Sequence, residues 1–132
     1  MQTIKQLAED QVTEALNRYH GFFAFSDKQF DEASTKGFKY VACGLGLYAP
    51  IDYAEVLVDK IRAIHKEAAK VVQTQTSKKD RIWYEFSNHE CQIVGDYSDA
   101  VDALSSFDDI TIEDIKNEWS AYWDHCVDND YF

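Results

Sequence analysis

Two short segments of the chain bring histidine and cysteine close together, and these residue types are the most able to do chemistry. They are Asn88-His89-Glu90-Cys91 and Asp124-His125-Cys126. Imidazole and thiolate groups bind zinc, so the two His-Cys pairs could supply a Cys₂His₂ set. On a helix, however, residues two apart project about 200° from each other and adjacent residues about 100°, so neither pair converges. The spacing favours packing and hydrogen bonding, and we predict no metal site and no cofactor.

A cysteine nucleophile is the other chemistry to weigh. It requires a thiolate stabilised by positive surroundings, whereas Cys91 and Cys126 lie in the most acidic part of the chain. Cys43 lies in a more neutral stretch, but no particular histidine can be assigned to it. Gly44-Leu45-Gly46 lacks the further glycine and lysine positions of dinucleotide-binding and P-loop motifs, so it predicts a turn. We therefore expect the protein not to be an enzyme.

Acidic side chains dominate the C-terminal part of the chain. From Ile82 to Phe132 the only Lys or Arg is Lys116, set against thirteen Asp and Glu, so this segment has a net charge of −12. Residues 1–76 have a net charge of −1. A strongly negative field repels nucleic-acid phosphates and anionic membranes and attracts basic protein surfaces. The acidic C-terminal half, residues 82–132, is therefore expected to bind a basic protein surface, with no direct nucleic-acid or membrane binding.

Capping residues and helical periodicity predict a mostly helical chain. A side chain that can cap a helix precedes each of five segments with apolar periodicity. These capping residues are Thr3, Ser26, Asp52, Ser77 and Thr111. The apolar residues that follow recur with a period of about 3.6, which places them on one side of each helix. A further short helix is expected after Gly95.

Short strands are expected near residues 22–25 and 39–48, where aromatic and β-branched residues lie beside a glycine turn. The predicted fold is mostly α (α+β), a compact bundle of five to six helices with one or two short strands. A chain of 132 residues, 45% of them hydrophobic, suits a single domain over residues 1–132. Its start lacks a secretion signal, no apolar run approaches the ~20 residues of a membrane helix, and its three cysteines suggest no disulfide framework. We expect a cytoplasmic protein.

The helix expected after Thr111 shows how the acids could be presented. Its inward stripe is predicted to consist of Ile112, Ile115, Trp119, Tyr122 and Cys126. The outer side would then carry Glu113, Asp114, Glu118, Asp124 and Asp128. One helical turn is ~5.4 Å, and successive phosphates on a DNA strand are on the order of 6–7 Å apart, so such carboxylates could imitate a phosphate row. Trp123 is adjacent to Tyr122, cannot share the stripe with it, and is expected to contact a partner or a second protomer.

Further acids complete the predicted partner-binding surface. They are Asp99, Asp102, Asp108 and Asp109. A plainer interpretation remains open, because many proteins carry acidic surfaces only for solubility. The near absence of Lys and Arg over fifty-one residues favours a specific role, since an ordinary surface mixes both signs.

Two blocks of the chain resemble a known family. Tyr84-Glu85-Phe86-Ser87-Asn88-His89-Glu90, Gly95-Asp96 and Asp99-Ala100-Val101-Asp102-Ala103-Leu104 form one block, and Phe22 to Ser26 with Gln29-Phe30 form the other. They are similar to small, functionally uncharacterised proteins of tailed phages and prophages. The N-terminal helix and the Trp-rich acidic tail depart from that pattern. The resemblance implies a phage or mobile-element origin and no activity, and it leaves the role of Asn88, His89, Glu90, Gly95 and Asp96 unknown.

A phage origin makes a binding function of the acidic surface more plausible. Small acidic phage proteins resemble DNA mimics that block the basic DNA channels of CRISPR effector complexes or restriction enzymes. We therefore expect an anti-CRISPR or antirestriction inhibitor acting in the host cytoplasm. One alternative is a non-catalytic structural or regulatory phage protein, a homodimer or larger homo-oligomer, whose aromatic side chains form a self-interface. A second alternative is a small metal-binding enzyme.

Overall fold

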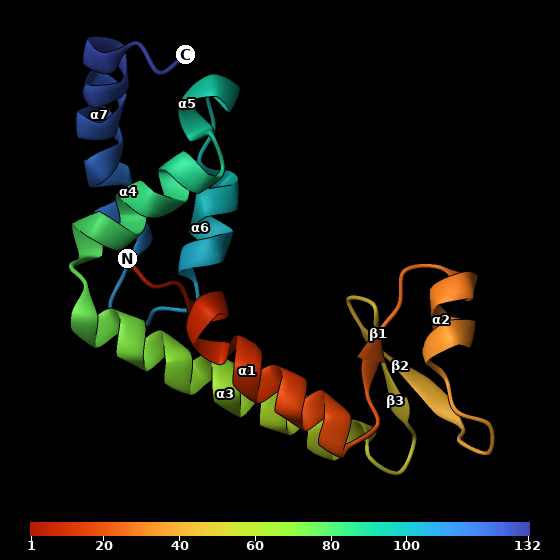
Figure 1. The fold of residues 1–132 in the computed structure, drawn as a ribbon. Helices are drawn as coiled ribbons and strands as arrows, with labels where there is room; N and C mark the ends of the chain where they lie inside the picture. The colour runs from red at the N-terminus through yellow and green to blue at the C-terminus, as the bar shows by residue number, and fades with distance from the viewer. The chain divides into compact units, whose positions relative to one another are not determined.

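The computed structural model describes residues 1–132 and is mostly helical, with a small antiparallel sheet (Figure 1). This confirms the expected fold class, although there are seven helices, one of them a single turn. The helices are α1 (Ile4–Arg18), α2 (Asp27–Ala33), α3 (Ala54–Gln75), α4 (Lys78–Asn88), α5 (Cys91–Val94), α6 (Ser98–Leu104) and α7 (Ile112–Asn129). The strands are β1 (Phe22–Phe23), β2 (Tyr40–Gly44) and β3 (Leu47–Pro50).

The chain forms two compact units. We call Gln2–Ala68 the sheet unit and Ala69–Phe132, together with Met1, the helical unit. The expectation of one domain over residues 1–132 stays a prediction. No helix has both the length and the apolar character needed to cross a membrane.

In the sheet unit, the strand order is β1-β3-β2 with antiparallel pairs. The turn before β3 has positive φ at Gly44, Leu45 and Gly46 (94°, 53° and 82°), which confirms the turn predicted there. Side chains of β3 alternate between the two faces of the sheet. Leu47 and Ala49 are buried among residues of α1 and α3, whereas Tyr48 stacks in an aromatic cluster on the other face. The other members of that cluster are Phe22, Phe30 and Tyr40.

The helix starts follow the predicted caps with one exception. Thr3 forms a capping box with Gln6: its hydroxyl accepts from the Gln6 amide at 3.1 Å, and the Gln6 side chain accepts from the Thr3 amide at 2.9 Å. Ser26 and Ser77 also cap their helices as predicted. Asp52 does not begin α3, because the first helical hydrogen bond runs from the Leu57 amide to the Tyr53 carbonyl. The helix therefore starts at Ala54.

The helical unit packs around an aromatic core. Phe86 of α4 is fully buried, and its ring lies 5.1 Å from those of both Trp119 and Tyr122 on α7. Further buried side chains of α4 to α7 complete this core, among them Ile82, Cys91, Ala100, Leu104, Ile115 and Cys126. Cys91 and Cys126 thus pack as apolar residues, as small thiols commonly do.

Candidate binding surface on the helical unit

The charge asymmetry of the sequence follows the two units of the fold. The helical unit carries fourteen Asp and Glu against five Lys and Arg, a side-chain net charge of −9. The sheet unit carries ten acids against eight bases, a net charge of −2. Negative charge is therefore concentrated on the helical unit, and the question is which of its carboxylates point to solvent with no partner.

α7 is the longest acidic element and is positioned by its cap. The Thr111 hydroxyl accepts from the Asp114 amide at 3.1 Å, and the Asp114 carboxylate accepts from the Thr111 amide at 2.9 Å. Ile115, Tyr122 and Cys126 are buried and confirm the inward stripe. Ile112 is 69% exposed, which corrects its predicted inward position: it is the first residue of the helix and lies before the packed stripe begins.

Four predicted surface acids are held by neighbours inside the unit. Asp109 accepts two bonds from Arg81, at 2.6 and 2.7 Å, and the Arg81 hydrogen bond lowers the pKa of Asp109 below its ordinary value. Asp114 caps α7, and this lowers its pKa as well. Glu118 was expected on the outer side, but its carboxylate accepts from Trp83 Nε1 at 2.9 Å. Asp108 is exposed and accepts from Gln73 at 2.8 Å.

Five predicted acids are exposed and have no side-chain partner. We call them the free acids: Asp99, Asp102, Glu113, Asp124 and Asp128. On α7, Asp124 and Asp128 are one turn apart, but Glu113 lies three turns before Asp124, roughly 16 Å along the axis. The exposed positions in between carry Lys116 and uncharged residues, so α7 presents an interrupted row of carboxylates. Glu90 and Asp130 are also exposed; the sequence selected Glu90 only as part of the family motif and did not select Asp130.

The Asn88-His89-Glu90 segment and the glycine that follows build the turns between helices. His89 is the C-cap of α4, and its Nε2 lies 3.1 Å from the Glu85 carboxylate. Glu90 adopts a left-handed conformation (φ 50°), and Gly95 does the same at the end of α5 (φ 77°). Asp96 then accepts from the amide and hydroxyl of Ser98 at the start of α6. These contacts give the segment an architectural role.

The possible nucleophile and metal ligands do not form a metal-binding cluster. Burial, followed by the charges of Asp99 and Asp96, raises the pKa of the Cys91 thiol, which disfavours a thiolate. The His125 ring lies 5.2 Å from that of Trp83, and its Nδ1 is 3.3 Å from the Asn129 amide nitrogen. No three His, Cys, Asp or Glu side chains gather where they could hold a metal ion.

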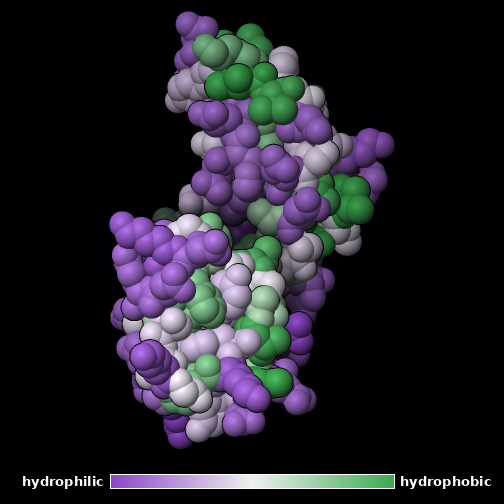
Figure 2. Space-filling model, turned by 90° about the vertical axis from the view of Figure 1, so that its right-hand side faces the viewer, coloured by the Kyte–Doolittle hydropathy of each residue, from purple (hydrophilic) through white to green (hydrophobic).

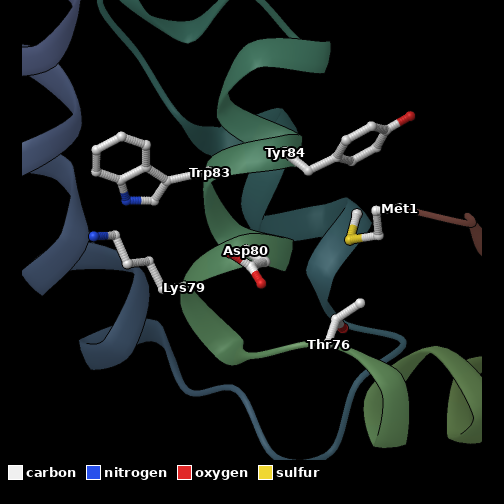
Figure 3. Close-up of a pocket in the computed structure, with 6 residues that line it drawn as sticks. All are labelled: Met1, Thr76, Lys79, Asp80, Trp83 and Tyr84. Carbon is white, nitrogen blue, oxygen red and sulfur yellow. The ribbon is translucent and has the colours of Figure 1, made fainter.

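Two surface clefts lie on the helical unit. One, of about 310 Å³, surrounds the start of α4: Trp83 and Lys79 lie on one side of the helix, and Met1 and Tyr84 lie on the other (Figure 3). The ammonium of Lys79 lies 4.8 Å from the Trp83 ring centre, so this cation already has a partner. The larger cleft, of about 450 Å³, is lined by Gly95, Trp119, Ser120 and Trp123. Sequence reasoning selected Trp123 but not Ser120.

Comparison with known proteins identifies the family. A family model matches residues 4–125, which extend from the start of α1 nearly to the end of α7. The chain belongs to DUF7659, a family of unknown function. No curated protein and no solved structure matches the chain. Because the DUF7659 match includes the α4–α6 turns and most of α7, the candidate surface lies almost wholly within the family's shared region.

Proposed function

We propose that this protein is a non-catalytic inhibitor of phage or mobile-element origin that binds a basic nucleic-acid-binding site on a host protein. The observation that carries the proposal is the net charge of −9 on the helical unit, with the five free acids turned to solvent. Anti-CRISPR or antirestriction inhibition is the specific form proposed, because CRISPR effectors and restriction enzymes hold DNA in strongly basic channels.

The few bases of the helical unit do little to offset the negative field of the free acids. Arg81 is 2% exposed and bound to Asp109, Lys78 lies 3.5 Å from Asp114, and Lys79 lies over Trp83. Only Lys70 and Lys116 have no such contact. Most of the positive charge is therefore used within the unit, whereas the free acids are available to an approaching partner.

The proposed mechanism is steric and electrostatic. The free acids would pair with Arg and Lys side chains that otherwise hold nucleic-acid phosphates, and the bulk of the unit would cover the groove. Complementary charge raises the association rate at low ionic strength, and salt screens it over about 10 Å at 0.1 M. Binding should accordingly weaken steeply as salt is added.

Reversing free acids tests the proposal. The variant Glu113→Lys/Asp124→Lys/Asp128→Lys avoids the capping and buried carboxylates, so the fold should persist. The matched control, Glu9→Lys/Asp10→Lys/Glu14→Lys, makes the same charge change at exposed positions of α1 in the sheet unit. Each protein would compete with labelled duplex DNA for a panel of purified CRISPR effector complexes and restriction enzymes at several salt concentrations.

We expect the unmodified protein and the α1 control to displace DNA from at least one panel member at low salt. The α7 variant should lose displacement. Equal displacement by all three proteins, or none by the unmodified protein, would contradict the proposal.

Self-association is the second candidate function, favoured by apolar side chains exposed on the helical unit. Val94, Val127 and Phe132 are 69%, 56% and 57% exposed. Two copies of a unit with charge −9 repel each other, so salt should strengthen self-association and weaken binding to a basic partner. Light scattering at two protein concentrations and two salt concentrations separates these functions by the sign of the salt effect.

A further inference from the structure

The cleft beside α7 has an aromatic floor that is open to solvent. Trp119 and Trp123 lie one turn apart on one flank of α7, with ring centres 5.8 Å apart, and Trp123 is 37% exposed. Gly95 forms the opposite wall where α5 ends. Gly95 carries no side chain, so nothing projects from this wall into the cleft. A Cβ atom added at Gly95 would have no neighbouring atom within 4 Å. The volume of about 450 Å³ falls within the range of roughly 300–1,000 Å³ typical of ligand pockets.

Apolar side chains continue outward from this floor. Phe132 packs edge-on against Trp123 with ring centres 5.1 Å apart, and Val127 follows Trp123 by one turn on the same flank of α7. Val94 precedes Gly95 on the other wall and is 69% exposed. Figure 2 shows green side chains at the upper end of the helical unit, over α5. Gln92 of α5 donates to the Tyr131 carbonyl at 3.0 Å, which fixes the C-terminal residues beside α5.

Acidic residues lie close in sequence to both walls. Asp124 follows Trp123 directly, and Asp96 and Asp99 follow Gly95 within four residues. Lys116 is the one base on this flank of α7, one turn before Ser120. An apolar cleft on a unit with a net charge of −9 is complementary to an apolar side chain surrounded by Lys and Arg. The same charge opposes a second copy of this chain as the occupant.

We propose that this cleft is an anchor site for a basic amphipathic helix of the partner protein, and that one large apolar side chain of that helix inserts between Gly95 and the Trp119–Trp123 floor. The inference rests on the proposed function, because it locates where the basic partner is held. The free acids supply long-range attraction, whereas the cleft supplies short-range contact that salt affects little. Residues at the centre of interfaces that are desolvated on binding commonly contribute most of the affinity.

Two synthetic peptides test the anchor. Both are basic helices of about 18 residues, or five turns, rich in Lys, Arg and Ala. One carries a central phenylalanine, and the other carries serine at that position. Binding of each fluorescein-labelled peptide would be measured by anisotropy against the full-length protein and two variants. Ser120→Trp fills the cleft from an exposed position, and Ala121→Trp places the same ring on the adjacent exposed position outside the cleft.

The phenylalanine peptide should bind the unmodified protein at least about tenfold more tightly than the serine peptide, as expected for burying one Phe side chain. Ser120→Trp should remove that preference, and Ala121→Trp should keep it. Equal binding of the two peptides to the unmodified protein, or a preference that survives Ser120→Trp, would overturn the anchor and leave the charge-based function standing. If neither peptide binds at low salt, the proposed function itself fails. Dimerisation of the unmodified protein that Ser120→Trp abolishes would assign the cleft to a second copy instead.

Discussion

The two units are stabilised by different kinds of interaction. In the sheet unit, small and aliphatic side chains of α1, β3 and α3 form the core, and aromatic rings fill the other face of the sheet. In the helical unit, the buried guanidinium of Arg81 is bound to Asp109. It lies 4.7 Å from the Phe107 ring centre, beside an aromatic core. The units also differ in net charge, −2 against −9. The comparison indicates that charge has two roles in the helical unit: a buried ion pair stabilises it, and unpaired carboxylates are exposed on its surface. The stability of the sheet unit depends mainly on packing.

Leu57→Ala should have the largest effect on stability and should act through packing alone. Leu57 is fully buried in the sheet unit, and its truncation leaves a cavity that costs about 3 kcal/mol of unfolding free energy. Urea denaturation followed by far-UV circular dichroism measures the loss, which should not change between low and high salt. Val56→Ala, at a position 49% exposed on the same helix, should cost less than about 0.5 kcal/mol. A similar loss in both variants would contradict the assigned core.

Asp109→Ala should have the next largest effect and should act through charge. It leaves the 2% exposed guanidinium of Arg81 without its partner, and such a loss costs about 2–3 kcal/mol when the removed partner is partly exposed. The control is Asp108→Ala, which removes an exposed carboxylate with a single hydrogen bond from Gln73. All three tryptophans lie in the helical unit, so their fluorescence follows its unfolding selectively. Equal stability of the two variants would refute the structural role of this ion pair.

The same ion pair predicts a pH dependence. Because the Arg81 hydrogen bond lowers the pKa of Asp109 in the folded protein, the pair stabilises fully above the ordinary pKa of an aspartate, about 4. That contribution is lost as the pH falls through the ordinary pKa toward the lower folded one. The stability difference between the unmodified protein and Asp109→Asn should therefore be largest near neutral pH and should shrink in acid. A difference that is constant with pH would mean that Asp109 acts through shape and not charge.

Local signals in the sequence predicted the elements better than the surface. Caps at Thr3, Ser26, Ser77 and Thr111 are confirmed because a cap needs only residues three positions apart. The cap predicted at Asp52 is wrong because Pro50 and the turn after β3 delay the start of α3. The position of that start depends on the strand that precedes the turn.

The candidate site was harder to predict because exposure depends on partners distant in the chain. Glu118 faces outward by periodicity alone, yet Trp83, thirty-five residues earlier, donates to it. Asp109 likewise pairs with Arg81, twenty-eight residues earlier. Helical spacing gives no information on either pair. The cleft itself had one local signal, the adjacency of Trp123 to Tyr122, since only one of them could be buried.

The two capping boxes allow the finest comparison of the units, with the smallest expected effects. Thr3→Ala and Thr111→Ala each remove a hydroxyl that accepts a hydrogen bond from a backbone N–H at the start of a helix. Each should lower the free energy of unfolding by about 1 kcal/mol.

The reciprocal acceptor of the two capping boxes differs, since it is the neutral Gln6 in α1 and the ionised Asp114 in α7. A carboxylate at a helix start also interacts favourably with the helix dipole, and salt screens that interaction. Replacing Asp114 by Asn should therefore lower the free energy of unfolding by less at high salt than at low salt, whereas the cost of Gln6→Ala should not change. Urea denaturation at two salt concentrations measures both. If the cost of Asp114→Asn is independent of salt, neither the helix dipole nor Lys78, 3.5 Å away, contributes through charge, and Asp114 acts by hydrogen bonding alone.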